Sequence, residues 1–153
     1  MSGPERPQPA DDYRREHTTP RIKFSAWMPR AERAAREVAE KFRPRSINTY
    51  PGHDGEPRDA LEKGESESVD YYVCPWTHRP TKAQGQQRIE MAEYVVRHAK
   101  RLGVKNAISG GYIWFPDGRG WRKYNPHNYK LWHPKDNVWS KYHYDHLHVH
   151  YFW

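Results

Sequence analysis

The chain has 153 residues, a length that suits one domain of ordinary size. Its 26 Lys and Arg outnumber the 19 Asp and Glu, and the net charge of +7 favours an anionic partner such as nucleic acid, a phospholipid surface or a cell-wall polymer. The single cysteine excludes a disulfide framework and cysteine-rich metal sites, and no apolar stretch is long enough to form a membrane helix.

Residues 1–20 are polar, charged and rich in proline. Such a segment cannot offset the entropy lost on ordering, which predicts a disordered tail before a single domain over residues 21–153. The tail has no apolar stretch typical of a secretory signal, so we expect synthesis in the cytoplasm without a signal peptide. Over the whole chain, Trp, Tyr and Phe number 22 against 17 Leu, Ile and Val, which predicts a core built mainly from aromatic side chains.

Two segments have the apolar spacing of amphipathic helices. The first covers residues 29–42 and ends before Pro44. The second covers residues 82–102 and is followed by Gly103, a residue that favours the end of a helix. The face of this second helix expected to be buried consists of Ile89, Ala92, Val95, Val96, Ala99 and Leu102.

Four segments are predicted as strands because they are rich in β-branched and aromatic residues. They cover residues 46–50, 69–73, 107–115 with an interruption at Gly110 and Gly111, and 142–152. Loops rich in Gly and Pro separate them. Together with the two helices, these strands predict an α+β fold.

Histidine is concentrated at the end of the chain, where His143, His146, His148 and His150 lie within the last eleven residues. Alternate residues of a strand point to the same face, so His146, His148 and His150 share one face. Because imidazole is the commonest side-chain metal ligand, this cluster predicts a metal site.

Two earlier residues are candidates to complete that site. His53 follows the first predicted strand, and Asp70 lies inside an apolar strand, where a carboxylate needs a cationic partner. A metal ion is one such partner for Asp70, and one of the 26 Lys and Arg is the alternative.

These residues carry a resemblance to a known group of enzymes. A histidine before a strand, an aspartate in Ser-Val-Asp-Tyr and the terminal His-Tyr-Asp-His-Leu-His-Val resemble the LAS-type zinc peptidase superfamily, which includes lysostaphin, D-Ala-D-Ala carboxypeptidases and the hedgehog fold. The terminal sequence is most similar to domains found in actinobacteria and their phages. The resemblance implies a small antiparallel sheet with two main helices packed around it.

The resemblance also implies a ligand set for Zn²⁺: His53, Asp70 and His148. In the family the first two ligands are usually a few residues apart, whereas His53 and Asp70 are separated by 17 positions. Asp59 is therefore an alternative to Asp70, although the strand context favours Asp70.

Three further residues have implied or expected roles in catalysis. The resemblance implies that His146 is the catalytic or transition-state-stabilising imidazole and that His143 is an accessory histidine. Asp145, expected on the opposite face of the strand, is a poorer general base and is better suited to orienting a neighbouring side chain. The implied reaction is zinc-dependent hydrolysis of an amide bond in peptidoglycan peptides, at the bacterial cell wall after release by lysis or carriage on a virion.

The implied partners are peptidoglycan, anionic wall polymers and, in a phage particle, other virion proteins, while membrane insertion and nucleic-acid binding are not expected. Trp114, Trp121, Trp132 and Trp139 lie in or near the loop before the final strand, where they either line a substrate groove or pack in the core.

Two other functions stay open. The long spacing of the first two ligands is compatible with a non-catalytic wall-binding or virion module on the same fold. His146-Leu147-His148 also fits the His-hydrophobic-His motif of single-strand DNA nickases, with Tyr94 as the nucleophile. The absence of a stretch dense in Lys and Arg disfavours the nickase.

Overall fold

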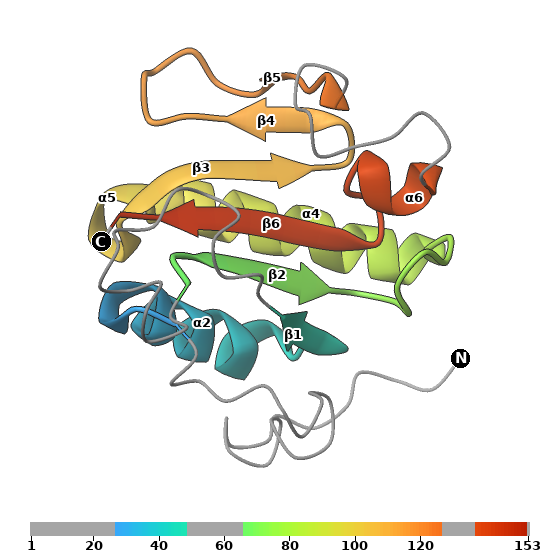
Figure 1. Cartoon of the computed structure of the whole chain (residues 1–153), viewed down its shortest axis with the longest axis horizontal. Helices are drawn as coiled ribbons and strands as arrows, with labels where there is room; N and C mark the ends of the chain where they lie inside the picture. The colour runs from blue at the N-terminus through green and yellow to red at the C-terminus, as the bar shows by residue number, and fades with distance from the viewer. Residues whose placement is uncertain (1–26, 49–65, 127–136, 153) are drawn as a thin grey trace.

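The computed structural model describes residues 27–48, 66–126 and 137–152. Within these ranges the chain forms one six-stranded antiparallel sheet and four helices (Figure 1), which confirms the α+β prediction. The helices are α2 (Pro29–Phe42), α4 (Lys82–Arg97), α5 (Ala99–Leu102) and α6 (Val138–Lys141). The strands are β1 (Ser46–Asn48), β2 (Ser68–Tyr72), β3 (Val104–Ser109), β4 (Tyr112–Trp114), β5 (Arg122–Lys123) and β6 (His146–Tyr151). The expected tail over residues 1–20 lies outside the described ranges.

The first helix forms as its sequence predicts. Pro29 occupies the first turn of α2, where its missing N–H costs no hydrogen bond. Arg43 ends the helix in the left-handed conformation, with a φ of 54°, and Pro44 follows. Alanine and valine side chains form the buried face, so α2 can approach the sheet closely.

The second predicted helix is divided in two. A capping box between Thr81 and Gln84 starts α4, the helical run breaks at His98, and α5 ends at Gly103 with a φ of 77°. The expected burial of Ile89 is wrong: this side chain is 40% exposed, while Met91 is fully buried. The buried positions of α4 begin at Arg88 and recur three and four residues later, which rotates Ile89 out of the core.

The sheet has the order β1-β2-β6-β3-β4-β5, so the last strand lies between β2 and β3 (Figure 1). Leu147, Val149 and Tyr151 of β6 join the hydrophobic core, to which α2 and α4 also contribute. The alternate residues His146, His148 and His150 therefore point to the opposite face of the sheet.

The strands differ from the prediction in several places. β2 covers residues 68–72 and not 69–73, β3 begins at Val104 and not at residue 107, and β5 lies in a segment predicted as a loop. Gly110 and Gly111, both with positive φ, form a two-residue turn that joins β3 and β4 as a hairpin, so residues 107–115 are not one interrupted strand. The final strand begins at His146 and not at residue 142. The physical reason is that the carbonyls of Tyr142 and His143 accept hydrogen bonds from Gly111 and Gly110, so this segment binds the hairpin turn instead of extending the sheet.

The expected aromatic core is also wrong. Among the described residues, the contiguous buried cluster consists mostly of Ala and Val, and its aromatic members are Trp27, Tyr71 and Tyr151. The hydroxyls of Tyr71 and Tyr151 are hydrogen-bonded at 2.8 Å. Small side chains on the helices leave little space between helix and sheet, so most rings pack at the edge of the core or on the polar face.

Candidate active site

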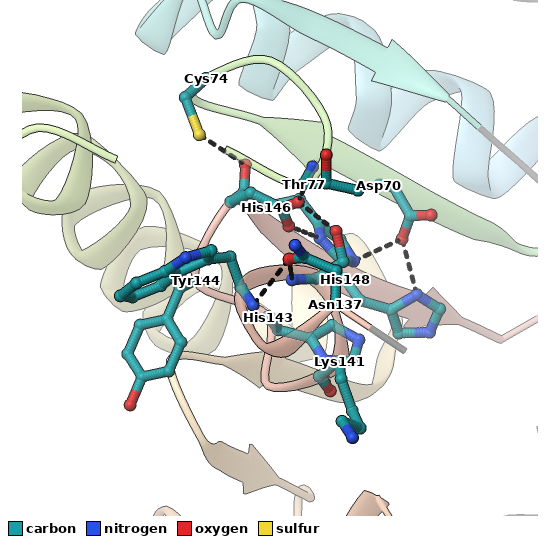
Figure 2. A network of polar contacts seen from close by, with 12 residues as sticks. Asp70, Cys74, Thr77, Asn137, Lys141, His143, Tyr144, His146 and His148 are labelled. Atoms are coloured by element: carbon teal, nitrogen blue, oxygen red, sulfur yellow. Dashed lines mark hydrogen bonds and ion pairs between the residues drawn. The ribbon is translucent and has the colours of Figure 1, made fainter. Parts of the chain in front are cut away.

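Three of the predicted site residues meet on the polar face of the sheet. Asp70 of β2 pairs in register with His148 of β6, and His148 Nδ1 lies 2.8 Å from Asp70 Oδ1. His146 Nε2 approaches the same oxygen at 3.8 Å (Figure 2). All three residues are less than a tenth exposed. Two neighbouring strands thus direct one carboxylate and two imidazoles at a single point.

Asp145 holds the other nitrogen of His146. His146 Nδ1 lies 2.5 Å from Asp145 Oδ1, while the Thr77 N–H, at 2.9 Å, and the Ser140 hydroxyl both donate to Asp145 Oδ2. Burial raises the pKa of Asp145, but the hydrogen bonds and the charge of His146, with those from Ser140 and Thr77, lower it below its ordinary value overall. The ionised Asp145 carboxylate accepts a hydrogen bond from His146 Nδ1–H, and Nε2 is the ring nitrogen that faces Asp70.

The expected orientation of Asp145, on the face opposite His146, is therefore wrong. Asp145 precedes β6, in a turn where strand alternation does not apply, and its carboxylate is directed back to its neighbour. The expectation that it orients a neighbouring side chain agrees with this contact.

His143 lies against the same cluster but comes from the turn. Its φ is 60°, a conformation that non-glycine residues rarely adopt, and its Nδ1 is 3.2 Å from the Lys141 carbonyl oxygen. The ring centroid of His143 is 4.5 Å from that of His146 and 5.9 Å from that of His148. The three imidazoles form one packed group.

The turn over residues 142–145 is fixed by four different donors. The carbonyls of residues 142 and 143 accept from the backbone of the β3–β4 turn, as described above. The Tyr144 carbonyl accepts from Arg88 Nη1 at 3.1 Å, and the Asp145 carbonyl accepts from the Val73 N–H at 3.0 Å. Every carbonyl of this segment thus accepts a hydrogen bond: two from the β3–β4 turn, one from α4 and one from the residue after β2.

His150 belongs to a separate carboxylate–imidazole pair on the same face. His150 Nε2 lies 2.5 Å from Glu67 Oε1, and His150 Nδ1 lies 3.2 Å from Asn106 Nδ2. Sequence reasoning missed Glu67, although its position just before the strand that carries Asp70 was a signal. Each histidine of β6 therefore has its own nearest carboxylate: His146 has Asp145, His148 has Asp70 and His150 has Glu67.

The chemistry of Asp70 and His148 fits a zinc ion. Carboxylate oxygen and imidazole nitrogen bind Zn²⁺ at about 2.0–2.2 Å, which places two such donors roughly 3.4 Å apart on a tetrahedral ion. The 2.8 Å between His148 Nδ1 and Asp70 Oδ1 is a direct hydrogen bond, which a metal ion held by both groups would replace. No group of three or more His, Cys, Asp and Glu able to hold a metal occurs among the described residues. His53 and Asp59 lie outside the described ranges.

Tyr94 does not join the histidines. Its hydroxyl donates to Glu37 Oε2 at 2.7 Å, and its ring packs edge-on against Phe42. Glu37 and Phe42 belong to α2, and Tyr94 packs against the hydrophobic core on the face opposite His146. The arrangement proposed for a nickase, with a tyrosine beside the histidine pair, is not present.

The candidate groove tryptophans have different positions. Trp114 and Trp121 are partly buried against the core, Trp139 packs against Tyr144 and Arg79, and Trp132 lies outside the described ranges. Sequence reasoning missed Trp76, which is 65% exposed beside Thr77. An exposed indole has no signature in a single sequence.

Comparison with known families adds one finding. A profile of the family described as "VldE, C-terminal domain" matches residues 24–139, well over half of the 153 residues. The chain belongs to the VldE C-terminal domain family. The VldE match includes Asp70 but ends before His143, so the terminal histidines lie beyond the matched range. Searches of curated proteins and of solved structures found no match. Among the described residues no helix is long and apolar enough to span a membrane.

Proposed function

We propose that this protein is a zinc-dependent hydrolase of amide bonds in peptidoglycan peptides, a cell-wall lytic peptidase similar to the LAS-type superfamily. The observation that carries the proposal is the meeting of Asp70, His148 and His146 at one point, with Asp145 holding the far side of His146. A cluster of buried carboxylates and imidazoles of this kind is a candidate metal or catalytic site.

Asp70 and His148 would hold the zinc ion, with His53 as the third ligand. One ionised carboxylate and two neutral imidazoles leave a net charge of +1 at such a centre. Zinc there supplies Lewis acidity, which polarises the scissile carbonyl and makes water a stronger nucleophile near neutral pH.

His146 acts as the proton acceptor. Its Nε2 faces the Asp70 carboxylate, and its Nδ1–H is held by Asp145, so the free lone pair is directed at the reacting position. Asp145 then stabilises the imidazolium that forms when Nε2 takes the proton. General base catalysis of this kind contributes about 10²–10⁴ in rate. The packed ring of His143 restricts the motion of His146.

The substrate class follows from the surface and from the sequence resemblance. The charge of +7 suits anionic wall polymers, and the exposed Trp76 offers a flat surface on which a sugar ring can stack. The protein would act at the cell wall, after lysis or as part of a virion, where other virion proteins are partners.

The test is a comparison of metal content and hydrolysis. Purified protein is assayed for bound zinc by mass spectrometry and for release of soluble peptides from cell walls, with and without a chelator. We expect His148→Ala and Asp70→Asn to lose zinc and to lose activity by about 10²-fold or more, because each removes a ligand. His78→Ala, which changes an exposed histidine, is the matched control. A His148→Ala protein with full zinc content and full activity would refute the proposal.

A non-catalytic wall-binding or virion module is the second candidate. The observation that favours it is the low exposure of Asp70, His146 and His148, none above 7%. For this function we expect wild-type protein to bind zinc and to sediment with cell walls without releasing peptides.

A further inference from the structure

Arg88 is a buried cation on α4 that the proposed chemistry does not use. It is 8% exposed, and its Nε donates to Ser109 Oγ at 2.9 Å. Its Nη1 donates to the Tyr144 carbonyl oxygen at 3.1 Å, and its guanidinium lies 5.5 Å from the centre of the Tyr144 ring. One side chain therefore joins α4, the end of β3 and the turn that precedes β6.

The surroundings of Arg88 are neutral. No carboxylate among the described residues forms an ion pair with it, and burial lowers its pKa. An arginine side chain nevertheless remains charged in proteins, so a guanidinium buried among a hydroxyl, a carbonyl and a ring is costly. An apolar side chain could pack between α4 and the sheet without the cost of burying a charge.

The glycine beside Arg88 is matched to the guanidinium. A Cβ atom at Gly110 would lie 2.6 Å from Arg88 Nη2, so a larger residue there would displace the end of the guanidinium. The Gly110 N–H donates to the His143 carbonyl at 2.7 Å, directly before the carbonyl that Arg88 binds. Arg88 and Gly110 thus bind consecutive carbonyls of the same turn.

We propose that Arg88 is a positioning residue for the His146–Asp145 pair, which acts by fixing the peptide group between Tyr144 and Asp145. The Tyr144 carbonyl belongs to the peptide group whose nitrogen is that of Asp145, so the bond from Arg88 limits rotation of the backbone that carries the carboxylate. That carboxylate sets the orientation of His146 through the 2.5 Å contact at Nδ1. The kinetic consequence rests on the proposed function, whereas the effect on the His146–Asp145 contact does not.

The experiment compares Arg88→Met, Arg88→Lys and the control Arg97→Met, which changes an exposed arginine on the same helix. The first readout is the exchange rate with water of the His146 Nδ1 proton, followed by NMR in metal-free protein. The second is kcat and KM for cell-wall peptide hydrolysis, with zinc content measured in parallel. Circular dichroism and thermal unfolding select the variants that fold.

We expect Arg88→Met to speed exchange of the His146 proton about tenfold or more and to lower kcat roughly 10- to 100-fold, with KM and zinc content unchanged. Arg88→Lys keeps the charge and one donor, so its rate of His146 proton exchange and its kcat should lie between those of Arg88→Met and wild-type protein. It serves as the test variant if Arg88→Met does not fold. Unchanged proton exchange in a folded Arg88 variant would overturn the proposal, and so would a parallel loss of zinc, because Arg88 would then support the fold in general. If wild-type protein does not hydrolyse cell walls, the proposed function fails, while the proton measurement still decides the role of Arg88.

Discussion

The two ring nitrogens of His146 face different carboxylates. Nδ1 contacts the fully buried Asp145, whose other oxygen is occupied by Thr77 and Ser140, and Nε2 faces Asp70 at 3.8 Å. The 2.5 Å contact at Nδ1 is a short hydrogen bond, whereas the 3.8 Å contact at Nε2 is longer than a hydrogen bond. This asymmetry favours the tautomer that the proposed base needs, with the proton on Nδ1 and the lone pair of Nε2 on the side of the candidate metal site.

Replacing Asp145 by Asn tests the importance of that tautomer. The Asn amide has no negative charge and can donate to Nδ1, which would place the proton on Nε2 and remove the base. We expect zinc content and fold to be retained while kcat falls about 10²-fold or more. Steady-state hydrolysis and zinc analysis check this, with Asp117→Asn at an exposed aspartate as the control. Equal activity of the two variants would contradict the role given to Asp145.

At this scale the sequence predicted the side chains that meet at the candidate site but not those that hold them. Asp70, His146 and His148 were identifiable because a charge in an apolar strand and a two-residue histidine repeat are local signals. Arg88 and Ser140 were missed, because their importance depends on contacts across 56 and five residues, respectively, that no local pattern encodes.

Among the elements, one carboxylate of α2 accepts hydrogen bonds from both α4 and α5. Glu37 accepts from Arg101 at 2.7 and 2.8 Å and from the Tyr94 hydroxyl at 2.7 Å. The hydrogen bond from Arg101, followed by that from Tyr94, lowers the pKa of Glu37 from 4.5 to about 2 against the opposing effect of burial. The contact thus favours the ionised carboxylate in the folded protein.

Glu37→Gln should therefore destabilise the protein in a pH-dependent way. The folded pKa is depressed, so the stabilisation is fully present above the unfolded value of 4.5 and is lost as the pH falls toward about 2. Because the Glu37 side chain is 34% exposed and that of Arg101 is 56% exposed, we expect a loss of only about 0.5–1 kcal/mol near neutral pH. Urea unfolding at about pH 7 and about pH 3 measures it, with Glu40→Gln on an exposed position of the same helix as the control. A difference that stays constant over this pH range would contradict the assignment.

Element boundaries were predictable where local signals were sufficient. Proline and alanine spacing marked α2, and Gly103 marked the end of α5. The start of β6 was not predictable, since residues 142–145 have strand-like composition and leave the sheet only because the β3–β4 turn and Arg88 bind their carbonyls.

At the scale of the whole molecule, the candidate ligands connect the central strand β6 to β2, the strand beside it. Asp70 belongs to β2 and His148 to β6, and the six strands are in the order β1-β2-β6-β3-β4-β5. A metal ion held by both would bind the folded protein and not the unfolded chain, so it should raise stability by mass action.

Zinc should therefore raise the unfolding temperature. At a free concentration one hundred times Kd, the gain is about 2.7 kcal/mol, or roughly 5–10 °C for a protein of this size. Calorimetry of chelator-treated and zinc-loaded protein tests the prediction, and Asp70→Asn should abolish the shift. An identical shift in that variant would place zinc elsewhere.

The central position of β6 has a consequence for folding. β6 is the last of the six strands along the chain, and β2 and β3 pair with it and not with each other. Before β6 is inserted, the hairpin of β1 and β2 and the meander of β3, β4 and β5 have no strand between them. Closing the sheet therefore brings together residues nearly eighty positions apart, such as Asp70 and His148. The conformational entropy lost on closing that long loop is lost in one late step. Site assembly and completion of the sheet are then the same kinetic event, so a partly folded chain should have no capacity for high-affinity metal binding at Asp70 and His148.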